Sequence, residues 1–89
     1  MKPSDIITQY GWIQGAPESE QGFCLQGALY NVYRGHHDPW KLMQVTRQVQ
    51  AVIFNNGQPY HKWASISEWN DTPGRTKRQV LAVLRKAGQ

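Results

Sequence analysis

The chain has 89 residues, which is the size of one domain near the small end of what folds alone. Its single cysteine excludes an internal disulfide framework, and no apolar run approaches the roughly 20 residues that a membrane span needs. The formal net charge is +4, from ten Lys and Arg against six acidic residues, and the polar N-terminus lacks the apolar segment of a signal peptide. We therefore expect one soluble, cytoplasmic domain over residues 1–89, with no membrane contact.

A short helix and a loop are predicted at the start of the chain. Ser4 and Asp5 are good N-cap residue types, so the spacing predicts a helix over 6–10 that ends at Gly11. Residues 11–22 contain three Gly and one Pro, a composition typical of a loop.

Two longer helices follow this loop. Apolar residues recur at helical spacing over 23–33, and Gly27 inside that stripe predicts a close approach of another helix or an aromatic ring. Asp38 is a candidate N-cap and Pro39 suits the first helical position, so the next helix is predicted over 40–53.

The C-terminal third is predicted to hold a helical turn and a last helix. Residues 65–69 favour one turn of helix, and Thr72-Pro73-Gly74-Arg75 fits a type II turn. Thr76 and Gln79 form the capping box of the final helix, which Gly88 ends. Together the elements predict an all-α fold, a compact bundle of about four helices plus one short helical turn.

Three sequence blocks occur in a distinctive order. They read Gly-Trp-Ile-Gln-Gly at 11–15, Cys-Leu-Gln-Gly-Ala-Leu at 24–29 and Ile-Ser-Glu-Trp-Asn-Asp-Thr-Pro-Gly-Arg-Thr at 66–76, before a Val-Leu-Ala-Val-Leu-Arg-Lys-Ala ending. This order resembles a family of small uncharacterised proteins from actinobacteria and the bacteriophages that infect them. The matching blocks cover about 11–29 and 66–87. The resemblance implies a shared fold and an actinobacterial or phage origin, and it implies no activity.

We interpret the distinctive residues of these blocks as structural. Asn and Asp side chains accept backbone N–H bonds in turns, which explains Asn70 and Asp71 without any ligand. The alternative is a polar functional site presented beside Trp69. The residues with the structural interpretation are Cys24, Gly27, Trp69, Asn70, Asp71, Arg75 and Thr76.

Cys24 at a helix start is a candidate nucleophile. Free N–H groups and the helix dipole lower the pKa of a thiol at that place. With one of the histidines as base and Asn70 or Asp71 to orient it, a cysteine hydrolase can be drawn. No glycine-rich oxyanion loop accompanies Cys24, so we favour a small buried apolar residue and expect no enzyme.

A metal site is the second chemical alternative. Its ligands would be His36, His37, Asp38 and His61, with or without Cys24. Adjacent histidines point in different directions, and the chain has no His-x3-His or Cys-x2-Cys pair. We therefore expect no metal and no cofactor.

Two surfaces are candidates for binding. Aromatic side chains are the usual anchors of protein interfaces, and an exposed patch is predicted from Trp40, Tyr60 and Trp63. Basic residues near the C-terminus suit phosphate contacts, because a helix N-terminus also attracts anions. These residues are Arg75, Lys77, Arg78, Arg85 and Lys86.

The resulting hypotheses fall into three classes. The first is a non-catalytic accessory protein of phage or phage-related origin that binds a host or phage protein in the host cytoplasm. The second is a weak nucleic-acid binder that uses the basic C-terminal helix. The third is the hydrolase built on Cys24.

Overall fold

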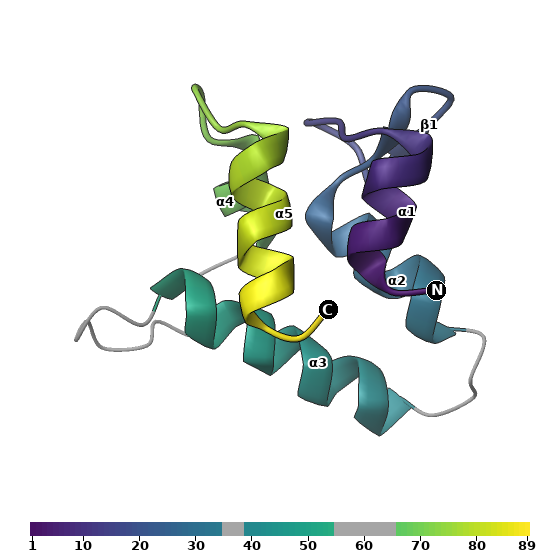
Figure 1. The fold of residues 1–89 in the computed structure, drawn as a ribbon, viewed down its shortest axis with the longest axis vertical. Coiled ribbons are helices and arrows are strands. Elements are labelled where there is room, and N and C mark those ends of the chain that lie inside the picture. The colour runs from purple at the N-terminus through teal and green to yellow at the C-terminus, as the bar shows by residue number, and fades with distance from the viewer. Residues whose placement is uncertain (35–38, 55–65) are drawn as a thin grey trace.

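The computed structural model describes residues 1–34, 39–54 and 66–89. Over these ranges the chain forms five helices and one two-stranded antiparallel sheet (Figure 1). The elements are α1 Pro3–Tyr10, β1 Glu18–Ser19, β2 Gly22–Phe23, α2 Leu25–Tyr33, α3 Pro39–Phe54, α4 Ile66–Asp71 and α5 Lys77–Lys86. The fold is mostly helical as predicted, but it is not purely α, because the predicted loop over 11–22 contains a β-hairpin.

Helix α1 begins earlier than the sequence predicts. Its N-cap is Lys2 and Pro3 occupies the first turn, where a missing N–H costs nothing. The carboxylate of Asp5 accepts the Lys2 amide at 2.9 Å. The prediction that Ser4 or Asp5 caps this helix is therefore wrong: the Ser4 hydroxyl donates instead to the carbonyl of Gln89 at 2.8 Å.

The hairpin shortens the second predicted helix. Phe23 lies in β2, where its amide donates to the carbonyl of Gly11 at 3.0 Å and its carbonyl accepts the amide of Ile13 at 3.1 Å. Helix α2 therefore begins at Leu25 rather than at residue 23. Glycine at position 22 allows the backbone of β2 to approach that of Gly11 closely, because a Cβ on Gly22 would lie 2.2 Å from the carbonyl oxygen of Gly11.

Gly27 does make a close contact, but with a partner that the sequence did not indicate. A Cβ at this position would lie 1.9 Å from the carbonyl oxygen of Pro17. The neighbour is therefore the backbone of the segment leading into β1, neither a helix nor an aromatic ring. The Cys24 amide donates to the same Pro17 oxygen at 3.0 Å, which holds that segment against α2.

The remaining helices agree closely with their predicted ranges. Helix α3 begins at Pro39; its expected N-cap, Asp38, lies outside the described residues. Helix α4 is a short helix in which Ile66 is buried. In the turn that follows, Gly74 has φ +86°, as a type II turn requires. The predicted capping box opens α5: Thr76 Oγ1 accepts the amide of Gln79 at 3.2 Å.

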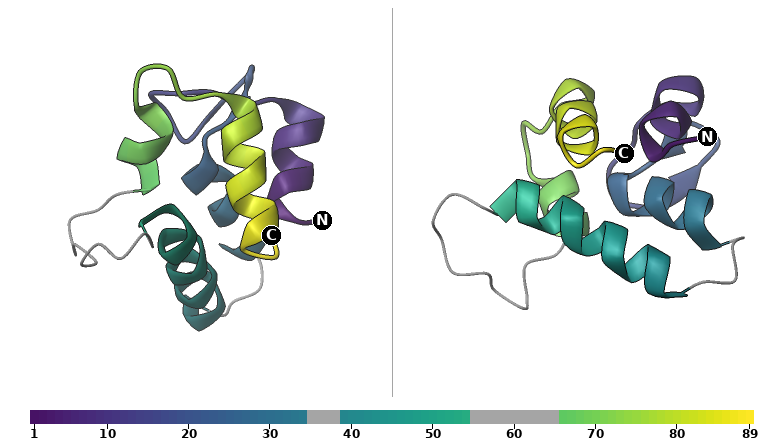
Figure 2. Two further views of the ribbon diagram at one scale, coloured as in Figure 1. Left: turned by 60° about the vertical axis from the view of Figure 1, so that its left-hand side comes forward. Right: turned by 60° about the horizontal axis from the view of Figure 1, so that its bottom comes forward.

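The hydrophobic core draws on all five helices. Helices α1 and α5 lie side by side above α3, and the two chain ends meet on one side of the molecule (Figure 2). Ten aliphatic side chains form the buried cluster, each worth about 1.5–3 kcal/mol when fully buried, except the smaller alanine. They are Ile6, Ile7, Leu25, Ala28, Leu29, Val45, Val49, Ile66, Val80 and Leu84. In the described part of the chain, no helix is long and apolar enough to cross a membrane.

Candidate functional site

Asn70 is the polar centre of the molecule. Its side chain is fully buried, at 0% exposure, near the end of α4. The Oδ1 atom accepts the indole N–H of Trp12 at 2.6 Å and the amide of Leu25 at 3.0 Å. The Nδ2 atom donates to the carbonyl of Ile13 and to the carboxylate of Asp71, both at 3.0 Å. All four hydrogen-bonding positions of the amide are therefore used by the protein itself.

This arrangement also caps helix α2. The first amides of a helix have no partner inside the helix. Asn70 accepts the Leu25 amide from 45 residues away in sequence, and the Cys24 sulfur accepts the Gly27 amide at 3.2 Å. The N-terminus of α2 is thus closed by one local and one distant group, and those two amides are not free to hold an anion.

Three further hydrogen bonds join the first loop to α4 and to Thr72, which follows it. The Gly15 amide donates to the Asp71 carboxylate at 2.9 Å. The side-chain amide of Gln14 donates to the carbonyls of Asn70 and Thr72, at 3.0 and 3.1 Å. We call this set of hydrogen bonds, made by Trp12, Ile13, Gln14, Gly15, Leu25, Asn70, Asp71 and Thr72, the Asn70 cluster.

Sequence reasoning missed Trp12 and Gln14 as members of the Asn70 cluster. They lie 56 to 58 residues from their partners, so no local spacing relates them. One signal could have found them. The blocks at 11–15 and 66–76 both carry the family resemblance, and they meet in space at Asn70, which also accepts the Leu25 amide of the block at 24–29.

The Arg75 side chain makes contacts within the fold, with Trp69. Its guanidinium carbon lies 3.9 Å from the centre of the Trp69 ring, and its Nε donates to the Trp69 carbonyl at 3.0 Å. Such a cation–π contact fixes the turn between α4 and α5. Arg75 is therefore engaged within the fold, and the predicted phosphate-binding group is reduced to the residues of α5.

Cys24 is buried, with 3% of its surface exposed. Burial raises the pKa of its thiol, against the lowering effect of the Gly27 and Gln26 amides, and the Asp71 charge raises it further. The expected lowering at a helix start does not prevail, because desolvation outweighs the N-terminal amides. The structure does not describe the histidines proposed as its base. The same holds for the predicted metal site, because its ligands other than Cys24 lie outside the described residues; they are His36, His37, Asp38 and His61.

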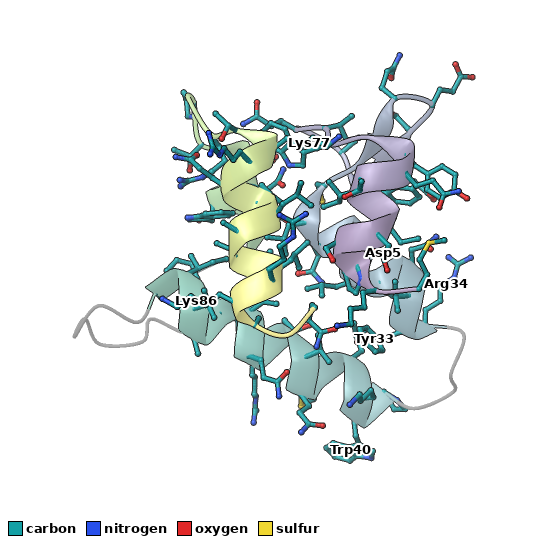
Figure 3. The ribbon with its side chains drawn as sticks, in the orientation of Figure 1. Asp5, Tyr33, Arg34, Trp40, Lys77 and Lys86 are labelled. Carbon is teal, nitrogen blue, oxygen red and sulfur yellow. The ribbon has the colours of Figure 1, made fainter. Side chains whose placement is uncertain are left out.

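One predicted aromatic, Trp40, lies on an open surface. It is 74% exposed and points away from the lower side of α3 (Figure 3). Tyr60 and Trp63, its predicted companions, lie outside the described residues. The described residues that line a shallow hollow of about 610 Å³ together with Trp40 come from its own helix. We call this surface the α3 outer face; it consists of Trp40, Met43, Gln44, Arg47, Gln48 and Ala51.

The basic residues of α5 are exposed but divided between its two ends. Lys77 and Arg78 stand in the first turn, and Arg85 and Lys86 in the last. Figure 3 shows Lys77 and Lys86 at opposite ends of the helix. The capping box satisfies two of the amides that an incoming phosphate would otherwise meet at this N-terminus, those of Thr76 and Gln79.

The fold and the Asn70 cluster define a small, mostly helical domain whose loop and helix segments are joined through one buried amide. The chain belongs to the family of unknown function DUF6197, which it matches over residues 3–89. The searches of curated proteins and of solved structures gave no match. Family membership therefore assigns no activity to the Asn70 cluster or to the surfaces.

Proposed function

We propose that this protein is a non-catalytic interaction module that binds a partner protein through the α3 outer face. The composition of that face carries the proposal. Interface centres are enriched in aromatic residues, Met and Arg, and depleted in Lys, Asp and Glu. The face holds Trp40, Met43 and Arg47, with Trp40 74% and Met43 45% exposed, and none of the three depleted charged types.

The spacing of these residues supports the same function. Trp40, Met43, Arg47 and Ala51 follow one another at three or four residues, so they form one stripe along α3. Val45 and Val49 on the opposite side are 1% and 0% exposed in the core. Helix α3 thus presents apolar side chains on two sides, and the side with Val45 and Val49 is the one that the described residues bury in the core. Helices that dock on partner proteins present anchors at this spacing.

Charge determines the chemistry of the partner. Helices α3 and α5 contain no acidic residue, and Arg47 lies within the stripe on α3. The partner that fits is an apolar protein surface bearing a carboxylate that pairs with Arg47. A second copy of the chain does not fit, because a two-fold interface would set Arg47 against an α3 outer face without a carboxylate.

The family resemblance supports a biological setting for this proposal. A phage or phage-related accessory protein acts on its host, so the partner is a host protein in the host cytoplasm. Cys24 has no part in this function. Its thiol is buried and its pKa is raised, whereas nucleophilic catalysis needs the thiolate.

The test is capture from a nuclease-treated actinobacterial lysate, followed by affinity measurements with the purified captured protein. Trp40→Ala should weaken binding more than about tenfold, because interface tryptophans are frequent hot spots. Tyr30→Ala is the matched control, since Tyr30 is 50% exposed on another helix. A carboxylate-to-Lys change on the partner should restore binding to Arg47→Glu. Equal affinities for wild type and for Trp40→Ala, or no captured protein, would overturn the proposal.

A second candidate function, weak nucleic-acid binding, is supported by one observation. Helix α5 exposes four cations and carries no acid. Their division between two ends of the helix, and the engagement of Arg75 with Trp69, support it less than the α3 outer face supports a protein partner.

A further inference from the structure

A hollow of about 350 Å³ lies between the hairpin and α2, away from the α3 outer face. One wall is the hairpin arm with Pro17 and Glu18, and the other is the outward side of α2 with Tyr30 and Arg34. Phe23 also lines it. We call it the hairpin hollow. Its volume is at the lower end of the range typical of small-molecule sites.

The walls of the hairpin hollow are held in place by the fold. The Pro17 carbonyl accepts the Cys24 amide at 3.0 Å and packs against Gly27, where no side chain would fit. The Phe23 ring meets Tyr10 edge-on, with ring centres 6.1 Å apart. Because these walls exist before any ligand arrives, binding there incurs little cost for ordering the protein.

Two aromatic rings and two opposite charges determine what suits the hairpin hollow. The guanidinium of Arg34 lies 5.6 Å from the centre of the Tyr30 ring, which restrains the cation. Glu18 stands on the other wall, paired in register with Phe23. Figure 3 shows Arg34 at the edge of the molecule, pointing outward from the end of α2.

We propose that the hairpin hollow binds a small aromatic carboxylate that also carries a hydrogen-bond donor. The ligand's ring packs against Tyr30 and Phe23, as aromatic pairs do. Its carboxylate accepts from the planar fork of Arg34, and its N–H or O–H donates to Glu18. One cation beside one anion disfavours phosphates, which need several positive groups.

The probe for this proposal is indole-3-acetate, titrated into the ¹⁵N-labelled full chain and followed by NMR. We expect saturable shifts at amides around the hairpin hollow, over 17–34. Arg34→Gln should weaken binding about tenfold, through loss of a charge-assisted hydrogen bond. Arg78→Gln makes the same substitution on α5 and should leave the affinity unchanged. Naphthalene-1-acetate, which lacks the N–H, should bind several-fold more weakly because Glu18 loses its donor.

A second variant tests the space rather than the charge. Gln26→Trp places a large ring from the lining of the hairpin hollow into it and should abolish the shifts. Thermal melting checks that each variant is folded. If Gln26→Trp does not fold, the affinity of Arg34→Gln alone tests the proposal. Shifts that do not saturate, shifts centred on α3 or α5, or equal weakening by Arg34→Gln and Arg78→Gln would overturn the proposal. None of these outcomes tests whether the α3 outer face binds a partner protein.

Discussion

Asn70 has, among the residues that the structure describes, the largest share of the side-chain hydrogen bonds between distant parts of the chain. It joins the first loop, the start of α2 and the end of α4 through four side-chain bonds. A buried amide with every position satisfied stabilises one arrangement of these segments, whereas any gap would leave an unpaired polar group. Its hydrogen bonds account for Asn70 without a bound ligand.

Asn70→Ala should lower the free energy of unfolding by about 3–5 kcal/mol. The substitution leaves the Trp12 indole N–H, the Leu25 amide and the Ile13 carbonyl without their partner, and each such group costs about 1–3 kcal/mol. Urea denaturation measures the change. Asn31→Ala, at an exposed position of α2, is the control and should stay within about 0.5 kcal/mol. Equal effects of the two variants would contradict this role.

Cys24 predicts a specific dependence of stability on pH. Burial raises the pKa of its thiol in the folded protein above the value in the unfolded chain. The protonated thiol is therefore the form that the fold prefers, and its contribution is complete below the unfolded pKa. That contribution is lost as pH rises from about 9 through the folded pKa.

The measurement compares wild type with Cys24→Ala by urea denaturation between pH 7 and pH 10.5. The difference in unfolding free energy should be constant near neutrality and shift against wild type in the alkaline range, since other titrating groups are common to both. Native protein should also react slowly with iodoacetamide at pH 7 compared with protein in urea. Rapid, stoichiometric labelling of the native protein would show that the thiol is accessible.

Among the elements, α2 depends most on its neighbours. Gly27 is the third residue of this nine-residue helix. Glycine lowers helix propensity, yet the packing requires it at this position. The Pro17 carbonyl occupies the space that a side chain would need. The same backbone contact forms part of the wall of the hairpin hollow, so the glycine contributes to both stability and shape.

Gly27→Ala should destabilise the protein although alanine is the better helix former. The new Cβ would meet the Pro17 carbonyl oxygen at 1.9 Å, so backbone must move. Overpacking of this kind costs about 1–3 kcal/mol, which lowers the melting temperature by roughly 5–20 °C in a domain of this size. Gln26→Ala, one residue earlier in the same helix, should change it little. A melting temperature raised by Gly27→Ala would contradict the close contact.

For the whole molecule, the distribution of charge is the main feature. The described acidic residues belong to the N-terminal third and to α4, and they are Asp5, Glu18, Glu20, Glu68 and Asp71. The charged residues of helices α3 and α5, which pack on each other, are all basic. The net charge of +4 is therefore concentrated on one part of the fold, which favours acidic partners and weak contact with nucleic acid.

Retention on DNA measures the weak contact with nucleic acid. We expect binding at low salt that is lost near physiological salt, because α5 offers only four cations. The slope of log K against log salt should be no steeper than about −4, and Lys77→Gln with Arg78→Gln should reduce it by about 2. Arg47→Gln on α3 is the control. An unchanged slope in the double variant would exclude the first turn of α5 as a contact.

Features set by neighbouring residues were determined by the sequence alone. Pro39 at the start of α3, the capping box of Thr76 and Gln79, and the type II turn with Gly74 all occur as predicted. Each involves groups within four residues of one another, so the residue types alone determine the local backbone geometry. The close contact at Gly27 was also predicted, but its cause lies in the tertiary structure, because the group that requires a glycine there is the Pro17 carbonyl.

Only the tertiary structure decided which distant groups meet. The N-cap of α1 is Lys2, because the Ser4 hydroxyl donates to the carbonyl of Gln89 at the other end of the chain. Phe23 lies in β2 and not in a helix, because its backbone pairs with Gly11 and Ile13 of the first loop. The partners of Asn70 were likewise hidden, because Trp12 lies 58 residues away and periodicity describes only one element at a time. Hydrogen bonds between remote segments form once the core has placed their backbones together, and that placement depends on the packing of all five helices described here.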